Sequence, residues 1–169
     1  MSSLVVFSTS TGNTKKIADA IFSALKDTNK KIVDVNEINK VNFNKFDKII
    51  IGGWIDKGEI DEKAKEFLTK LKNKKLGLFV TMGGNPETDR AKNCFQEIKK
   101  SLEKNGNIVE KIFVCQGAID PNLINKFREM TKQGIAGSFA ATPEREARWA
   151  ETAKHPDEKD MENAKRIFG

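Results

Sequence analysis

The residues best suited to chemistry lie in one short polar segment near the start of the chain. Residues 8–14 read Ser-Thr-Ser-Thr-Gly-Asn-Thr, so five of seven positions carry a hydroxyl group. A phosphate group needs several hydrogen-bond donors at short range. Hydroxyls and backbone N–H groups at a helix start supply them, together with the positive end of the helix dipole. The segment therefore predicts a phosphate-binding loop.

The alternative interpretation of this segment is a helix cap among ordinary turn residues. A cap would need only one or two of the hydroxyl groups. The GxxxxGK[ST] and GxGxxG patterns are absent, which argues against an ATP site or a Rossmann dinucleotide site. Phosphate binding is favoured because the segment follows the first predicted strand, and doubly wound sheets bind ligands where their strands end.

A second segment with binding chemistry is Gly52-Gly53-Trp54-Ile55-Asp56-Lys57-Gly58. It follows the third predicted strand, which is expected beside the first, so both segments should border one site. Trp54 either stacks on a flat heteroaromatic ring or is a core residue beneath the loop, and its polar and glycine neighbours favour stacking. A third segment at this edge is Thr81-Met82-Gly83-Gly84-Asn85-Pro86.

Four other residues with reactive or aromatic side chains are interpreted as structural. His155, the only histidine, precedes a proline and a predicted helix cap, so a turn role is favoured over haem ligation. Cys94 lies on the apolar stripe of a predicted helix and Cys115 in a predicted strand, so core packing is favoured over redox activity. Trp149 is expected to pack within the C-terminal part, with a lid over the bound ring as the alternative.

The apolar pattern predicts the elements that position these segments. Five short strands are expected at residues 3–7, 31–35, 48–51, 76–81 and 108–115, and the third is expected to end at Gly52-Gly53. Helical spacing predicts helices from Lys15, after the cap residue Asp61, and from Pro86. This alternation describes an α/β fold, a doubly wound five-stranded parallel sheet of order 2-1-3-4-5.

The alternation stops beyond Gln116. Helices are expected after Asp120, Thr142 and Asp157, and residues 131–141, which lack periodicity, are expected to form a mobile loop. We therefore predict a single domain spanning residues 1–169, with a core at about 1–120 and a helical extension at about 121–169.

The motif S-T-S-T-G-N-T after a first strand resembles the phosphate loop of the flavodoxin family, whose members bind FMN. The similarity in element order covers about residues 1–120. The resemblance implies that the FMN phosphate is held by six consecutive residues, namely Thr9, Ser10, Thr11, Gly12, Asn13 and Thr14. Flavodoxins often have an acidic residue next, whereas Lys15 and Lys16 stand here and add attraction for a phosphate dianion.

The same resemblance implies roles for the other two segments. Trp54 would stack on the flavin, and the Lys57-Gly58 peptide would hydrogen-bond the flavin N5, since glycine enters a positive φ at little cost. The pyrimidine edge would meet the third segment, at Met82, Gly83, Gly84 and Asn85. Many flavodoxins cover the outer ring face with a tyrosine here. This chain has no tyrosine, so that face is covered by Met82 or Asn85 or stays open to a substrate.

A further likeness concerns Cys115-Gln116-Gly117-Ala118-Ile119-Asp120-Pro121, together with Thr142-Pro143-Glu144-Arg145 and His155-Pro156-Asp157-Glu158. The combination resembles a subgroup of bacterial flavodoxin-like proteins with a helical C-terminal extension. Some members of the wider superfamily act in tetrapyrrole metabolism. The leading expectation is an FMN-binding redox protein that transfers electrons between a reductase and an acceptor. The alternatives are a flavodoxin-like reductase or binding protein for an anionic tetrapyrrole, either haem or an open tetrapyrrole, and a carrier that keeps the fold but has lost FMN.

The net charge of +6 bears on the partners. Residues 143–169 hold six basic and seven acidic residues, a net −1, which leaves +7 on residues 1–142. Flavodoxins are typically acidic, so this sign indicates an acidic partner protein or a carboxylate-bearing substrate, with compositional bias as the alternative. Basic residues spread over every predicted helix argue against nucleic acid. No apolar run approaches 18 residues, so we expect no membrane association and a cytoplasmic protein.

Overall fold

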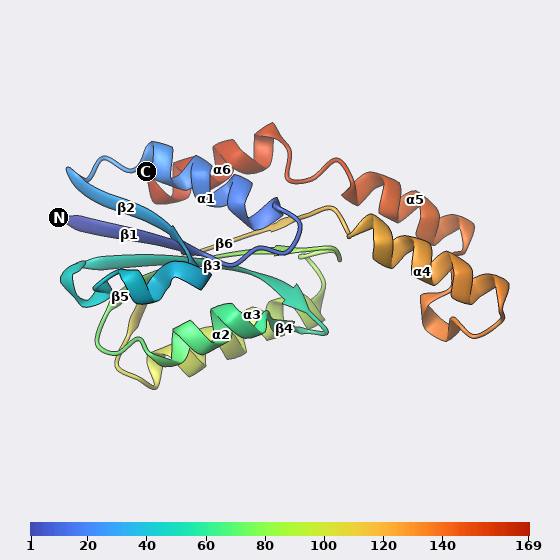
Figure 1. Ribbon diagram of the computed structural model, residues 1–169, viewed down its shortest axis with the longest axis horizontal. Helices are drawn as coiled ribbons and strands as arrows, with labels where there is room; N and C mark the ends of the chain where they lie inside the picture. Colours follow the sequence, from blue (N-terminus) through green and yellow to red (C-terminus); the bar gives the residue numbers. More distant parts are fainter.

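The computed structural model describes residues 1–169 and is built around a parallel sheet (Figure 1). Its strands are β1 (Ser2–Phe7), β2 (Asn29–Asp34), β3 (Lys48–Asp56), β5 (Lys75–Met82) and β6 (Ile108–Gln116), in the order β2-β1-β3-β5-β6. All six residues of β1, which lies between β2 and β3, are buried, as expected for a strand covered on both faces. The predicted parallel order 2-1-3-4-5 is confirmed.

The prediction that the third strand ends at Gly52-Gly53 is wrong. β3 continues to Asp56 and turns back through Lys57-Gly58 into β4 (Glu59–Ile60), a short antiparallel strand that the sequence pattern did not reveal. Phe79 occupies the space where a Gly52 side chain would lie. The glycine is there to let an aromatic ring pack on the strand, and it does not break the strand.

Two helical layers cover the sheet (Figure 1). On one face, α1 (Asn13–Ala24) and α6 (Glu158–Phe168) form an apolar cluster with alternate strand residues. On the other face lie α2 (Glu62–Thr69) and α3 (Asp89–Glu103), and the 3₁₀ helices η1 (Val35–Lys40) and η2 (Phe43–Lys45) also pack on this side. None of the helices is both long enough and apolar enough to cross a membrane.

Capping residues fix where the helices begin. Asp61 caps α2 and Asp157 caps α6 as predicted, the latter in a reciprocal capping box with Asp160. The helix predicted from Pro86 begins three residues later, at Asp89, because the Thr88 hydroxyl accepts the Ala91 N–H and supplies the cap. Proline alone was therefore a misleading start signal in the third segment.

The C-terminal extension forms a helical arm, which we define as residues 119–154. It contains α4 (Pro121–Lys132), the 3₁₀ turn η3 (Gly137–Phe139) and α5 (Pro143–Thr152). The arm projects beyond the end of the sheet where the strands finish (Figure 1).

The segment predicted as a loop at residues 131–141 is structured in part. Phe139 stacks on Phe127 with ring centroids 5.1 Å apart, and Phe127 stacks on Trp149 at 6.1 Å. Arg128 closes the arm with two hydrogen bonds to the Glu146 carboxylate, at 2.7 and 2.6 Å. Trp149 is buried in this cluster, so its predicted packing role is confirmed.

Candidate functional site

The predicted phosphate loop lies at the carboxyl end of β1 and leads directly into α1. Gly12, the residue before the helix, has a φ of 98°, and a side chain there would meet no atom within 4 Å. Its glycine is thus required by conformation and not by space. The Gly12 N–H is bonded to the Thr9 hydroxyl at 3.0 Å. The next N–H groups, at the start of α1, receive no side-chain cap, and no acidic residue lies in the first turn. Uncapped N–H groups of this kind are able to bind an anion.

The structure distinguishes the roles available to the six predicted phosphate residues. Ser10 and Thr11 are exposed, and Thr9 is half-buried. The Asn13 amide instead reaches across to the Ala118 carbonyl at 2.8 Å. The buried Thr14 hydroxyl lies 2.9 Å from the Thr81 hydroxyl. Asn13 and Thr14 can therefore offer a phosphate their backbone N–H groups while their side chains tie the loop to its neighbours.

Replacement of Gly12 by alanine tests the loop conformation. A Cβ at this positive φ is strained, so we expect the free energy of unfolding to fall by about 1–2 kcal/mol and FMN affinity to fall with it. Gly134→Ala is a matched control, since Gly134 has a φ of 71° and equally open space but lies in the arm. The control should lose similar stability in chemical denaturation while its FMN titration is unchanged. Equal FMN affinity in both variants would contradict the role of Gly12.

Asp61 joins the phosphate loop to the Trp54 segment. Its buried carboxylate accepts the Ser8 hydroxyl at 2.6 Å through one oxygen and the Trp54 N–H at 3.1 Å through the other. The Asp61 N–H in turn donates to the Trp54 carbonyl at 2.8 Å, and the carboxylate also caps α2 through the Ala64 N–H at 3.1 Å. Sequence patterns identified Asp61 as a cap only. The partners Ser8 and Trp54 could not be inferred from spacing, because Ser8 follows a strand 53 residues earlier and Trp54 is reached across the β3–β4 hairpin, which the sequence pattern did not reveal.

Trp54 lies at the carboxyl end of β3, paired in register with Thr81 of β5. Its side chain is half-buried and outside both core clusters. None of the aromatic stacks in the protein includes it. Strand alternation places it on the same face as Ile50, the face covered by α1. A half-exposed indole beside the phosphate loop has the position needed to receive a planar ring.

The turn that follows Trp54 is held by helix α3. Lys57 and Gly58 both have positive φ values, 51° and 85°, as a tight hairpin turn of the I′ kind requires. The Cys94 thiol donates to the Gly58 carbonyl with a sulfur–oxygen distance of 3.0 Å. Burial raises the pKa of Cys94, and the negative charge of Glu59 raises it further. The thiol therefore stays protonated and remains a donor. Cys94 is half-buried at the site, not fully in the core as predicted.

Removal of the Cys94 donor should loosen this turn. In Cys94→Ala we expect the free energy of local opening, measured by amide hydrogen exchange of the turn, to fall by about 0.5–1 kcal/mol. Cys94→Ser retains a donor and should restore most of the protection. If alanine and serine variants exchange alike, the hydrogen bond does not hold the turn.

The third segment completes the rim of the site. Thr81 is buried against Thr14, Met82 and Gly83 are half-buried, and Gly84 and Asn85 are exposed. The Met82 carbonyl accepts the Gly117 N–H at 2.9 Å, which joins this segment to the end of β6. No aromatic side chain belongs to the segment, so its outer surface is formed by small and flexible residues.

His155 lies in the connection between α5 and α6 and joins the two ends of the helical arm. Its carbonyl accepts the Ala118 N–H at 2.9 Å, and the Ala118 carbonyl accepts the Asn13 amide. The His155 ring is 2.6 Å from an oxygen of Asp160, which also belongs to the α6 capping box with Asp157. His155, Asp157 and Asp160 lie close enough to hold a metal ion, but capping accounts for their arrangement. His155 thus lies in a turn between two helices, as predicted, and haem ligation, the alternative, is untested.

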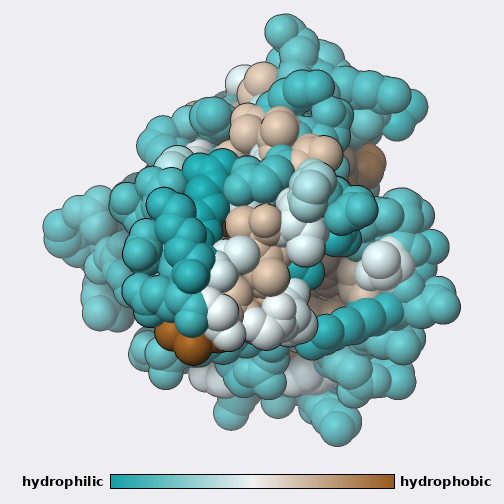
Figure 2. Space-filling view, turned by 90° about the vertical axis from the view of Figure 1, so that its right-hand side faces the viewer, coloured by the Kyte–Doolittle hydropathy of each residue, from teal (hydrophilic) through white to brown (hydrophobic).

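Figure 2 views the end of the molecule where the strands finish. A pale band of intermediate hydropathy crosses this otherwise hydrophilic face. The helical arm, which projects beyond this end of the sheet, lies nearest the viewer in this view.

A parallel sheet of this order with a hydroxyl-rich loop at the end of its first strand defines a flavodoxin-like protein. The flavodoxin domain family model matches residues 4–169, and the chain belongs to this family. It is similar to a flavodoxin-like domain-containing protein, BilS, of Clostridioides difficile strain CD3. The two are 34% identical over 166 residues, which cover 97% of this chain and 92% of the relative.

Solved structures give the same picture of the fold. The chain resembles the two-electron reduced flavodoxin of Megasphaera elsdenii, with 26% identity, a TM-score of 0.55, and coverage of 71% of this chain and 89% of the other. It also resembles a flavoprotein from Lactobacillus acidophilus solved in complex with FMN, with 18% identity, a TM-score of 0.51, and coverage of 74% and 97%. The latter likeness supports the fold.

Proposed function

We propose that this protein binds FMN and transfers electrons between a reductase and an acceptor. The observation that carries the proposal is the start of α1, where Gly12 at positive φ leaves backbone N–H groups uncapped beside a half-buried tryptophan with no aromatic partner. Uncapped donors fit a phosphate and a free indole face fits a planar ring. Their adjacency fits a ligand that contains both, and the family relationship makes FMN the candidate.

The residues of the site have distinct tasks in this proposal. FMN supplies the redox chemistry when it is bound. The loop from Thr9 to Thr14 holds the phosphate, and Trp54 orients the ring and excludes water from one side. The Lys57-Gly58 turn, at positive φ in both residues, presents its peptide groups to the ring edge. Asp61 keeps the phosphate loop and the Trp54 segment in a fixed relation.

The charge of the protein supports an acidic redox partner. The body that carries the site, residues 1–142, has a net charge of +7. Complementary charge accelerates encounter between electron-transfer proteins, and this effect weakens with salt. Stopped-flow mixing of the reduced FMN-loaded protein with basic cytochrome c, and with the same cytochrome c made acidic by succinylation of its lysines, separates the cases because the two acceptors differ in charge and share one haem. We expect faster transfer to the acidic acceptor at low salt, and loss of that advantage at high salt. Faster transfer to the basic acceptor would refute an acidic partner.

A second candidate is reduction or binding of an anionic tetrapyrrole at the outer face of the ring. The observation that favours it is the third segment, where Gly84 and Asn85 are exposed and no residue is aromatic. Titration of the FMN-loaded protein with haemin and with bilirubin tests this candidate. Binding with oxidation of the reduced flavin would support it, whereas neither binding nor turnover would leave the electron carrier.

A further inference from the structure

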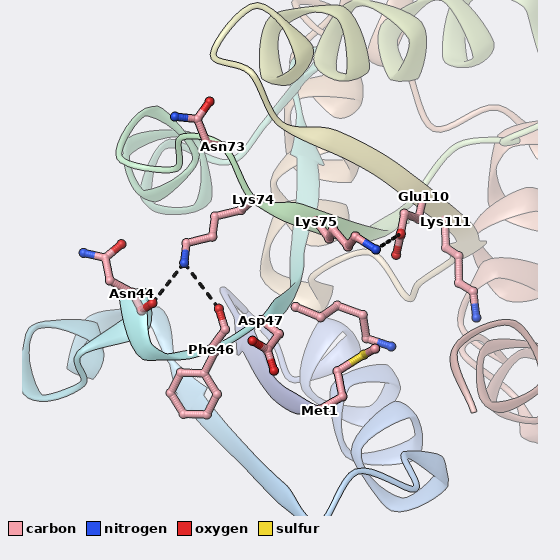
Figure 3. Close-up of a pocket in the computed structure, with 10 residues that line it drawn as sticks. Met1, Asn44, Phe46, Asp47, Asn73, Lys74, Lys75, Glu110 and Lys111 are labelled. Atoms are coloured by element: carbon pink, nitrogen blue, oxygen red, sulfur yellow. Dashed lines mark hydrogen bonds and ion pairs between the residues drawn. The ribbon is translucent and has the colours of Figure 1, made fainter.

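A groove at the opposite end of the sheet from the phosphate loop is lined by 10 residues, four of which are lysines (Figure 3). It has a volume of about 690 Å³ and lies where strands β3, β5 and β6 begin. Three of its lysines project from these strands: Lys48 of β3, Lys75 of β5 and Lys111 of β6. The groove therefore places several cations side by side, away from the proposed FMN site.

Lys48 and Lys75 are direct neighbours in the sheet. Their Cα atoms are register partners in the parallel β3–β5 pair. Strand alternation also directs both side chains to one face, because the following residues, Ile49 and Leu76, belong to the core cluster of the other face. Like charges directly opposite one another destabilise a sheet. The repulsion between Lys48 and Lys75 therefore lowers the stability of the sheet locally.

A β-bulge adds Lys111 to the same face. The register between β5 and β6 shifts after Leu76, so that Val109 pairs with Leu76 and Lys111 with Gly77. Glu110 is the extra residue, and its side chain and that of Lys111 both leave the face opposite Val109. Bulges of this kind re-aim side chains near functional surfaces. Without the bulge, Glu110 and Lys111 would point to opposite faces of the sheet.

The protein neutralises only part of this charge. Glu110 approaches Lys75 at 3.6 Å, whereas Lys48 and Lys111 have no carboxylate within ion-pair distance. Two other charged residues of the groove are used structurally (Figure 3). Lys74 donates to the carbonyls of Asn44 and Phe46, at 3.0 and 3.3 Å. The Asp47 carboxylate accepts two hydrogen bonds from Ser2, which lower its pKa. The three strand lysines and Glu110 leave a net charge of +2.

Many lysines on the helices, unlike Lys48 and Lys111, form ion pairs with nearby carboxylates. Lys15, Lys70 and Lys100 each pair with a carboxylate three or four residues away on the same helix, at 2.7 to 3.0 Å. Compositional bias toward lysine explains such solvated pairs. Compositional bias does not explain why Lys48 and Lys75 are register partners or why Lys111, beside a β-bulge, lies on the same face. A groove lined by one sign of charge concentrates ions of the opposite sign.

We propose that this groove binds a small polyanion with two or more phosphate or carboxylate groups. Adjacent strands are about 4.8 Å apart, so Lys48 and Lys111, on strands separated by β5, start about 10 Å apart. Long lysine side chains converge on anionic groups a few ångströms from one another. The ligand is distinct from FMN, because the groove and the phosphate loop lie at opposite ends of the sheet. The proposal does not depend on the function of the phosphate loop.

The test uses the FMN-loaded protein, so that the phosphate loop is occupied, or the protein as purified if it takes up no FMN. Pyrophosphate and citrate are titrated at constant ionic strength by calorimetry and by ¹H–¹⁵N NMR. We expect saturable binding with shifts centred on residues 48, 75, 110 and 111. Binding of both probes would define a general polyanion site, and binding of pyrophosphate alone would define a phosphate site.

Matched variants locate the site. The double variant Lys48→Gln with Lys75→Gln should lose about tenfold in affinity, since two exposed ion pairs with the ligand are removed. Lys63→Gln with Lys126→Gln removes the same charge from exposed positions of α2 and α4 and should change the affinity by less than about twofold. Absence of saturable binding, or an equal loss in both double variants, would overturn the proposal.

Discussion

Replacement of Asp61 by asparagine should weaken both the fold and the FMN site. The buried carboxylate accepts hydrogen bonds through both oxygens, from Ser8, Trp54 and Ala64. An asparagine amide has one acceptor oxygen, so its NH₂ group would face a donor. We expect the free energy of unfolding to fall by about 2–4 kcal/mol. Because the phosphate loop and the Trp54 segment lose their common anchor, FMN affinity should fall by at least about tenfold.

Asp120→Asn is the matched control for Asp61→Asn. Asp120 caps α4, but its carboxylate accepts only the Asn122 N–H, at 2.9 Å. Asparagine is as good a cap as aspartate, so the control should change stability by less than about 0.5 kcal/mol. Chemical denaturation and FMN titration are measured on both variants. The anchoring role of Asp61 is wrong if the two variants lose the same stability and affinity.

Replacement of Trp54 by alanine should weaken FMN binding with little effect on the fold. The indole is half-buried and lies outside both core clusters, so its loss should leave no large cavity. Stacking of a planar base on an aromatic side chain contributes about 1–3 kcal/mol, and we expect a comparable loss here, about 5- to 150-fold in dissociation constant.

Trp54→Phe and Trp149→Phe separate stacking from general packing. Phenylalanine at position 54 retains a stacking surface and should recover part of the affinity. Trp149 is buried against Phe127 in the arm, so its replacement should lower stability without changing FMN affinity. Unchanged FMN affinity in Trp54→Ala, measured by flavin fluorescence, would refute the stacking role.

The sequence predicted the parallel core well because local signals and burial agree there. Strands β1 and β6 and the caps Asp61, Asp120, Thr142 and Asp157 lie where the patterns placed them. Errors arose where tertiary contacts decided the outcome. Gly52 indicated the end of a strand, but the strand continues, and the Phe79 ring packs where a side chain at position 52 would lie. Residues 131–141 lacked periodicity, yet Phe139 packs on a ring from α4, a contact between non-neighbouring residues.

In the candidate site, too, local features could be predicted from the sequence and long-range contacts could not. Backbone features were predictable, because the Ser8–Thr14 composition and the glycine at position 12 specify a loop before a helix. Side-chain partners were not, because they lie far apart in sequence. The sequence assigns Asn13 and Thr14 the same phosphate-binding role as Ser10 and Thr11. In the structure the Asn13 side chain bonds the Ala118 carbonyl, and the Thr14 hydroxyl bonds the Thr81 hydroxyl. Asp61 appeared to be only a cap because Ser8, its partner across the site, is 53 residues away.

The central claim is that the loop at the start of α1 and Trp54 together bind FMN. The most direct measurement is titration of the apoprotein with FMN, followed by flavin fluorescence and the visible spectrum. We expect the flavin fluorescence to be quenched until one equivalent of FMN is bound, the visible spectrum to be that of a bound flavin, and FMN to be released on denaturation. A colourless protein that leaves the fluorescence of added FMN unchanged would contradict this claim.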